Sequence, residues 1–211
     1  MQIVSCRTDL HDKRLLALTF DDGPERTCTN RILDVFSSHG VRATFFALGS
    51  AIAGNEDLLE RATAEGHEVG SHFFSHESPV GRSDGFIRAE IERATRAIEE
   101  ATSSSPRLLR PPFGEEPQRA AALGARSGYT HVVLWSVLAG DWRNPSPAVI
   151  QTLVLQLVTP GAIVLLHDGA PPGDSTRRDN TVAAVEALVP ELLRREFDLV
   201  TVSDLLGASP G

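Results

Sequence analysis

The sequence predicts an α/β fold in which short parallel strands alternate with helices. Brief apolar runs recur along the chain, and a segment with apolar residues at helical spacing follows most of them. The length of 211 residues, with 41% hydrophobic and 23% charged residues, suits one large globular domain, which we expect to span residues 1–211. A parallel sheet can be open or closed, and about seven strand candidates favour a (β/α) barrel.

Seven segments have the composition of short buried strands. They are mostly apolar, several are rich in β-branched or aromatic side chains, and residues that favour turns bound them. In chain order the predicted strands are 15–20, 41–48, 67–71, 107–110, 130–137, 162–166 and 199–202.

Six segments between these strands have the apolar spacing and the end residues of helices. Asn55 and Ser83 can each cap a helix, and Pro117 suits a first helical turn. Pro190 is expected to kink the last helix. The segment 169–180 is rich in Gly, Pro and charge, and is predicted to be a surface loop that overhangs a neighbouring strand end. The predicted helices are 29–39, 55–65, 83–101, 117–127, 146–157 and 181–197, followed by a turn over 203–206.

Charge and cysteine content argue against several functional classes. The net charge of −8 and the isoelectric point near 5.3 oppose binding to nucleic acid or to an anionic membrane. Cys6 and Cys28 do not form a metal-type pair, and two reduced thiols are favoured over one disulfide bridge. No signal peptide or membrane span is visible, so the chain as numbered is expected in the cytoplasm, or outside the cell if a signal was removed. A monomer is expected.

Two adjacent carboxylates, Asp21 and Asp22, follow the first predicted strand and precede a Gly-Pro turn. Neighbouring side chains on an extended segment point to opposite sides, so the two carboxylates cannot share one role. One can bind a metal while the other faces a water or a substrate. For this stretch in isolation, a solvated turn is the simpler interpretation.

Further ionisable side chains stand at or just after strand ends: His72, Arg110, Asp141 and His167. In a parallel barrel such ends meet at one face. His72 and His76 are four residues apart, a separation that places two imidazoles on one face of a helix. With Asp22 they can form a site for a divalent metal, most suitably zinc, with cobalt or nickel as alternatives. Two surface or capping histidines are the competing interpretation.

The remaining groups suit hydrolysis. A metal lowers the pKa of bound water toward ~7, and Asp21 would be the free carboxylate that accepts its proton. Arg110 could hold Asp21 ionised. Asp141 could likewise raise the pKa of the His167 imidazole, which then has a proton to donate.

The candidate residues stand in five short motifs, which are, in chain order, Thr19-Phe20-Asp21-Asp22-Gly23-Pro24, His72-Phe73-Phe74-Ser75-His76, Arg110-Pro111-Pro112-Phe113-Gly114, Asp141-Trp142 and Leu165-Leu166-His167-Asp168. These motifs, in this order, resemble those of the polysaccharide deacetylases with a NodB homology domain, carbohydrate esterase family 4. The resemblance covers nearly the whole chain and implies a distorted (β/α) barrel of about seven strands.

The resemblance also implies a role for each site residue. Asp22, His72 and His76 would bind the metal. Asp21 would be the catalytic base, oriented by Arg110.

The remaining site residues would donate a proton or surround the acetyl group. His167 would be the catalytic acid, oriented by Asp141. The backbone N–H of Phe113 would help to hold the oxyanion, and Trp142 and Leu165 would line the acetyl pocket.

Two positions depart from the family pattern. Phe73 stands where a Ser or Thr usually follows the first metal histidine, and its ring is expected near the site. Leu138 stands where a further acid usually lies, three residues before Asp141. Both residues are expected to make the rim of the site more apolar, which bears on the substrate more than on the chemistry.

The predicted activity is metal-dependent hydrolysis of the acetamide of N-acetylated amino sugars. Short chito-oligosaccharides or an N-acetylglucosaminyl small molecule fit the chain better than insoluble wall polymer, because no carbohydrate-binding module or anchor is visible. An O-acetyl esterase acting on acetylated xylan is an alternative with the same chemistry. A catalytically silent sugar-binding module is a second alternative, although none of the implied catalytic residues is missing.

Overall fold

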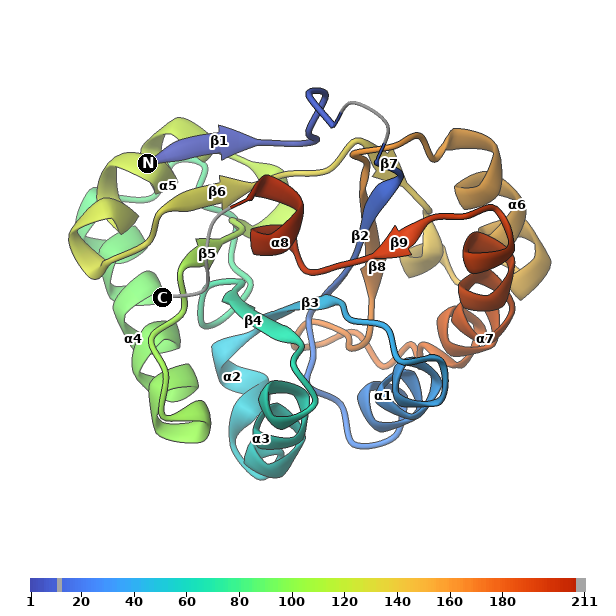
Figure 1. The fold of residues 1–211 in the computed structure, drawn as a ribbon. Helices are drawn as coiled ribbons and strands as arrows, with labels where there is room; N and C mark the ends of the chain where they lie inside the picture. Colours follow the sequence, from blue (N-terminus) through green and yellow to red (C-terminus); the bar gives the residue numbers. More distant parts are fainter. Residues whose placement is uncertain (11–12, 208–211) are drawn as a thin grey trace.

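In the described part of the chain, parallel strands form one nine-stranded sheet at the centre of the molecule (Figure 1). The structure is a computed structural model that describes residues 1–10 and 13–207. The strands lie in the order β1-β6-β5-β4-β3-β2-β8-β7, and β9 pairs with β2 outside this path. Every pairing between named strands is parallel, so the predicted α/β class is confirmed. The strands are β1 Gln2–Val4, β2 Leu15–Asp21, β3 Thr44–Ala47, β4 Glu68–Ser71, β5 Leu108–Leu109, β6 His131–Val133, β7 Val137–Leu138, β8 Ile163–His167 and β9 Asp198–Leu199.

Residues 134–136 connect two strands that lie near opposite ends of the sheet path. This connection gives the sheet the form of a distorted barrel. The single strand predicted over 130–137 is instead two strands, β6 and β7, separated by residues 134–136. β6 pairs with β1 and β5, whereas β7 pairs with β8 at the far end of the sheet path. This division and the unpredicted β1 account for the nine named strands, where about seven were expected.

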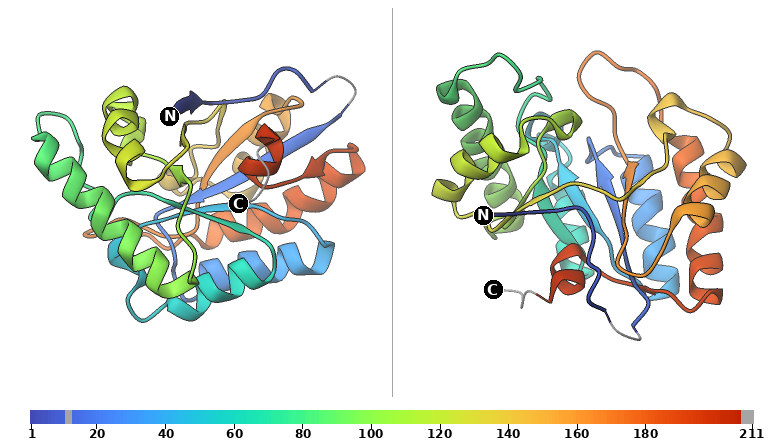
Figure 2. Two further views of the ribbon diagram at one scale, coloured as in Figure 1. Left: turned by 60° about the vertical axis from the view of Figure 1, so that its left-hand side comes forward. Right: turned by 90° about the horizontal axis from the view of Figure 1, so that it is seen from above.

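Helices cover the outside of the sheet (Figure 2). Each of the six predicted helices is present, with its ends within three residues of the prediction. The short α2 was not predicted, and the turn expected over 203–206 is the helix α8. The helices are α1 Cys28–His39, α2 Gly49–Ile52, α3 Glu56–Ala64, α4 Asp84–Thr102, α5 Pro117–Gly124, α6 Pro147–Leu157, α7 Asp179–Arg194 and α8 Val202–Leu206, with 3₁₀ turns η1 Pro112–Gly114, η2 Ala125–Ser127 and η3 Asp141–Arg143.

The predicted helix starts are correct in position, but one cap forms differently. The Ser83 hydroxyl accepts a hydrogen bond from the Phe86 N–H at the start of α4, as predicted. Asn55 precedes α3, yet its side chain donates to the carbonyl of Ala51, so it does not cap the helix. Pro190 lies inside α7, which continues past it to Arg194.

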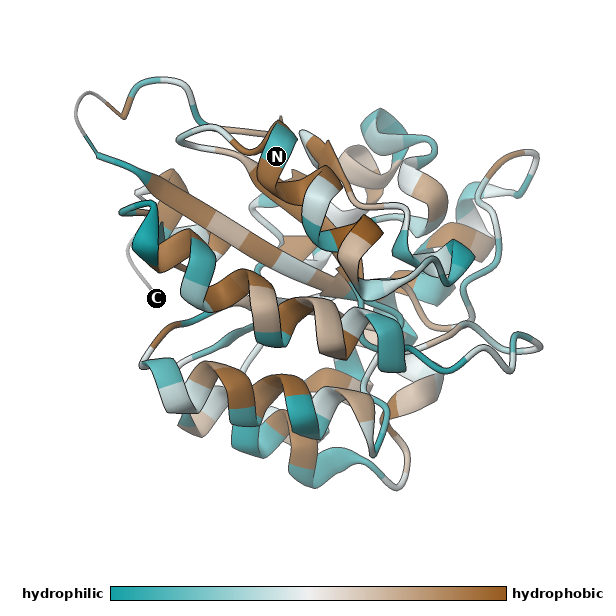
Figure 3. Cartoon of the chain, turned by 90° about the vertical axis from the view of Figure 1, so that its right-hand side faces the viewer, coloured by the Kyte–Doolittle hydropathy of each residue, from teal (hydrophilic) through white to brown (hydrophobic). Residues whose placement is uncertain are grey.

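The hydrophobic faces of the helices pack on the sheet. In Figure 3 hydrophobic residues run along the central strand, and the helices beside it alternate between hydrophobic and hydrophilic residues. Phe20 of β2 stacks on Phe45 of β3 with 5.3 Å between ring centroids, and Phe36 of α1 meets both rings edge-on. None of the helices in residues 1–10 and 13–207 is long and apolar enough to cross a membrane.

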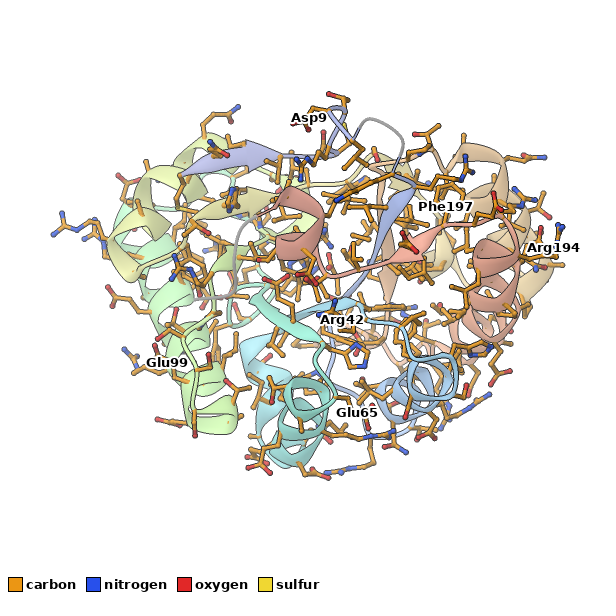
Figure 4. The ribbon with its side chains drawn as sticks, in the orientation of Figure 1. Asp9, Arg42, Glu65, Glu99, Arg194 and Phe197 are labelled. Carbon is orange, nitrogen blue, oxygen red and sulfur yellow. The ribbon has the colours of Figure 1, made fainter. Side chains whose placement is uncertain are left out.

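The amino-terminal end of the barrel is closed by α8. Val202 and Leu205 are fully buried and pack in one cluster with Phe46. Arg42, in the loop before β3, forms an ion pair of 3.1 Å with Asp204 of this helix (Figure 4). In parallel barrels the site lies at the opposite end, where the strands terminate.

Candidate active site

The strand register brings the ionisable side chains to one face. β2 pairs with β8 so that Asp21 lies beside His167. β4 and β5 are also paired, so His72 and Arg110, which directly follow them, become neighbours. Eight of the ten predicted site residues line one cavity of about 340 Å³, and the other two, Arg110 and Asp141, contact Asp21 and His167.

Asp22, His72 and His76 form a group that fits a divalent metal. Their ligand atoms all lie within 4.8 Å of one another, and Asp22 Oδ1 is 3.6 Å from His72 Nε2 and 3.3 Å from His76 Nε2. That oxygen is buried and has no hydrogen-bond partner among the described residues. A buried, unpaired carboxylate oxygen facing two imidazole nitrogens is the donor set of a metal site.

The imidazoles present the nitrogen atoms that such an ion requires. The Nδ1–H of His72 donates to the Arg110 carbonyl at 2.8 Å, which leaves the lone pair of Nε2 facing Asp22. Burial lowers the pKa of His76 to about 3, with a smaller effect of His72, so this imidazole is neutral at ordinary pH. Neutral imidazole is the form that ligates a metal.

The two histidines do not share a helical face, so this part of the prediction is wrong. Residues 72–76 form a loop after β4. Phe73 and His76 adopt left-handed backbone angles, with φ of 62° and 61°. The ring centroids of His72 and His76 nevertheless lie 5.1 Å apart, because the loop turns back on itself.

Strained backbone is concentrated at this site. Eight described residues other than glycine have positive φ, and four of them are either site residues or, for Phe73, stand between the two histidines. They are Asp22, Phe73, His76 and Phe113. Each such conformation costs on the order of 1–3 kcal/mol and persists only where surrounding contacts impose it.

Asp21 is held ionised by a buried arginine. Arg110 is fully buried, and its Nη1 donates to Asp21 Oδ1 at 2.6 Å and to the Thr19 hydroxyl at 3.0 Å. Its Nε donates to the Val133 carbonyl at 2.9 Å. Although burial alone would raise the pKa of Asp21, the charge of Arg110, with those of His72 and His167, holds this pKa below its usual value.

The pKa of His167 is shifted in the opposite direction, above its usual value. Its Nδ1–H and its backbone N–H donate to the two oxygens of Asp141, at 2.9 and 2.8 Å. The Thr181 hydroxyl donates to the same carboxylate at 2.9 Å. Burial alone would lower the pKa of His167, but the charge and hydrogen bond of Asp141 raise it to about 9. At neutral pH this imidazole therefore carries a proton.

The cavity walls are mostly apolar. The side chains of Phe113 and Leu138 are 59% and 42% exposed, and both lie at its rim. Trp142 meets the His167 ring at 5.8 Å between centroids, and Leu165 is buried beside them. Trp135, which was predicted only as part of a strand, lies in the gap between β6 and β7 and also lines the cavity.

The two departures from the family pattern have different positions. Leu138 lines the cavity, as expected. Phe73 does not, and the expectation of a bulky ring at the rim is wrong. Its side chain is fully buried and packs in a cluster with Ile87 and Ile91 of α4.

A buried arginine missed by the sequence analysis supports one cavity wall. Arg178 is 3% exposed and donates to the Gly169 carbonyl at 2.8 Å and to Asp174 at 3.1 Å. It also donates to the Trp142 carbonyl at 3.3 Å. The loop predicted over 169–180 thus reaches the neighbouring strand end, and its Pro171 lines the cavity.

Asp168, the last residue of the fifth motif, directly follows β8 and links this strand end to the turn after β2. Its oxygens accept hydrogen bonds from the Gly23 N–H at 3.2 Å and the Thr29 hydroxyl at 2.6 Å. Burial raises the pKa of this carboxyl to about 7. A Cβ atom on Gly23 would lie 2.1 Å from Asp168 Oδ2, so only glycine fits there.

A larger cavity of about 490 Å³ lies away from these residues, at the amino-terminal side of β4 and β5. The buried His67 borders it and accepts a hydrogen bond from the Ala43 N–H. No group of three possible metal ligands borders it among the described residues. The smaller cavity, which the Asp22–His72–His76 group borders, is therefore the candidate site.

Comparison with known proteins agrees with this arrangement. Residues 9–132 match the family model described as polysaccharide deacetylase. The chitooligosaccharide deacetylase of Bradyrhizobium sp. (strain ANU 289) is 42% identical over 198 residues, which are 90% of each chain. The crystal structure of the Bc1960 peptidoglycan N-acetylglucosamine deacetylase matches with a TM-score of 0.89 at 28% identity, over 98% of this chain and 94% of that one. BA3943 from Bacillus anthracis, a family 4 pseudoenzyme, matches with a TM-score of 0.85 at 25% identity, over 98% of this chain and 69% of that one. The chain belongs to the polysaccharide deacetylase family.

Proposed function

We propose that this chain is a metal-dependent N-deacetylase of N-acetylated amino sugars, with residues 1–211 as its single domain. One observation carries the proposal. A carboxylate held ionised, Asp21, and an imidazole held protonated, His167, border one cavity together with the Asp22–His72–His76 group. Two titratable groups with pKa values displaced in opposite directions are suited to act as base and acid.

The residues divide the hydrolysis between them. Bound at Asp22, His72 and His76, a divalent cation such as Zn²⁺, or Co²⁺ or Ni²⁺, would lower the pKa of water and polarise the acetyl carbonyl. Asp21 Oδ1 is bonded to Arg110, so its Oδ2 would accept the proton of the attacking water.

The second half of the reaction needs a proton at nitrogen. The water oxygen adds to the carbonyl carbon, and the Phe113 N–H would donate to the resulting oxyanion. Because Asp141 binds Nδ1 of His167, the Nε2–H would be the proton given to the departing nitrogen as the carbon–nitrogen bond breaks. The products are acetate and a free amine.

The substrate within this class follows from the rim. The similar Bradyrhizobium protein is a chitooligosaccharide deacetylase, and the Bc1960 protein acts on peptidoglycan N-acetylglucosamine. Phe113 and Leu138 are exposed at the cavity rim of this chain. An apolar rim favours an N-acetylglucosaminyl group joined to a small apolar partner, beside the chito-oligosaccharides.

Acetate release from a substrate panel tests the proposal. The panel contains chitotriose to chitohexaose, a peptidoglycan fragment, acetylated xylan and N-acetylglucosaminyl conjugates with an apolar group, each with added Zn²⁺ and after chelation. We expect metal-dependent release from the N-acetylated sugars. Release from acetylated xylan alone would replace the amidase with an O-acetyl esterase, and no release from a metal-loaded chain would leave it, like BA3943, a pseudoenzyme.

Leu138→Asp separates the two preferred substrates. It places a charge at an exposed rim position, so the fold should be retained. We expect kcat/KM to fall for the apolar conjugates and to stay within a few-fold for the chito-oligosaccharides. An equal change for both would contradict the role of the rim.

A further inference from the structure

A buried carboxylate outside the cavity binds the loop that carries the two histidines. Glu90 of α4 is 3% exposed, and its Oε2 accepts hydrogen bonds from the N–H and the hydroxyl of Ser75, each at 2.7 Å. Its other oxygen meets Arg93 at 3.5 Å. A carboxylate is costly to bury without partners, so its presence on the buried face of α4 requires this contact with the loop.

The contact lies directly before His76, where the loop is strained. Positive φ at Phe73 and at His76 brackets Ser75 on both sides. Relaxing either residue to an ordinary backbone conformation would change the path of the chain that carries the His76 imidazole. Two hydrogen bonds to one buried carboxylate oppose that relaxation.

His72 is fixed by other contacts. Its backbone N–H donates to the Ala47 carbonyl at 2.9 Å, in continuation of the sheet, and its Nδ1–H donates to the Arg110 carbonyl at 2.8 Å. The carbonyl groups of Phe73 and Phe74 accept from the amides of α2, each at 2.9 Å. These contacts hold the start of the loop, whereas the contact with Glu90 holds its end.

We propose that Glu90 and Ser75 are positioning residues that set the place of His76 within the metal site. They fix the backbone from which the His76 ring reaches to 3.3 Å from Asp22 Oδ1. The inference rests on the proposed function, because it takes Asp22, His72 and His76 as the metal ligands.

The affinity of the full chain for Zn²⁺, measured by competition with a chromophoric chelator, tests this role without an activity assay. Glu90→Ala should weaken Zn²⁺ binding by about 10-fold, the lower end of the effect of removing a direct partner of a metal ligand, because Glu90 acts through Ser75. Ser75→Ala keeps its N–H bond and should have a smaller effect. Glu90→Gln keeps an oxygen acceptor for that N–H and should restore part of the affinity.

A second readout separates positioning from general stability. The visible absorption spectrum of the Co²⁺ form reports the ligand geometry, and it should change in Glu90→Ala. Glu92→Ala removes an exposed carboxylate from the same helix and should change neither the spectrum nor the affinity. The double variant Ser75→Ala with Glu90→Ala should bind Zn²⁺ no more weakly than Glu90→Ala alone, because both act through one contact.

Each other outcome has a definite meaning. A lower melting temperature of Glu90→Ala with Zn²⁺ affinity within twofold of the parent would make the residue merely structural. If Glu90→Ala does not fold, the Zn²⁺ affinities of Ser75→Ala and Glu90→Gln provide the test. An affinity equal to that of the parent in both variants would overturn the positioning role. A parent chain that binds no Zn²⁺ would instead refute the proposed function, and the positioning role with it.

Discussion

Replacing Asp141 by asparagine tests whether its charge keeps His167 protonated for the proposed role as catalytic acid. The carboxylate is buried, and its two oxygens accept from His167 Nδ1, from the His167 N–H and from the Thr181 hydroxyl, at 2.8 to 2.9 Å. Asparagine has nearly the same shape and keeps one oxygen acceptor, but it removes the charge. We expect the pKa of His167 to fall from about 9 toward its ordinary 6.5, because burial is then opposed only by the charges of Asp21 and Asp22.

The size of the effect depends on pH. For a variant pKa of 6.5, the protonated fraction of His167 at pH 8 would fall from about 0.9 to about 0.03, a loss of up to about 30-fold in active enzyme. At pH 6 the loss from this cause would be less than about twofold. A bound cation repels the imidazolium in parent and variant alike, so it displaces both profiles and preserves the difference between them.

The assay is acetate release as a function of pH, with the His167 ring titrated by NMR in the metal-free chain. The alkaline limb of kcat/KM should move to lower pH in Asp141→Asn. Thr181→Val is the control, because it removes a hydrogen bond to the same carboxylate and leaves its charge. A loss of equal size at pH 6 and pH 8, or an unmoved alkaline limb, would refute the reasoning.

Two further substitutions probe the base and the loop. Asp21→Asn should lower turnover by about 10²- to 10⁴-fold, because the proton acceptor is lost. Zn²⁺ affinity should stay close to that of the parent, and unchanged turnover would remove Asp21 from the mechanism. Phe73→Ser replaces a fully buried ring that packs with Ile87 and Ile91, so it should cost about 3–5 kcal/mol in the free energy of unfolding. Denaturant titration measures that cost, and a serine variant as stable as the parent would contradict the packing.

The candidate site was predictable from the sequence because its groups stand at strand ends. Parallel strands have a regular rise and direction, so side chains at their carboxyl ends meet whatever the loops between them do. The pairing of β2 with β8 is an example, because its register places Asp21 beside His167. The family resemblance added a role for each of these residues.

The loops were not predictable in the same way. A spacing of four between His72 and His76 suits a helix, but the chain reaches the same proximity through two left-handed residues in a loop. The sequence does carry one signal for this loop, at Glu90. It lies among the apolar positions Ile87, Ile91 and Ala94, on the face of α4 that must be buried. A carboxylate on that face needs a partner, although the sequence does not say which.

Phe73 and Leu138 show why a substitution within a motif does not by itself locate its effect. Both are apolar residues where the family pattern has polar ones, and both were expected at the rim. Left-handed φ at Phe73 directs the chain so that the ring enters the core against α4, away from the cavity. Leu138 stands on β7, at the edge of the sheet path, where its side chain remains 42% exposed beside the site. We therefore expect Phe73 to act on the stability of the loop of residues 72–76, whereas only Leu138 is placed to act on the proposed choice of substrate.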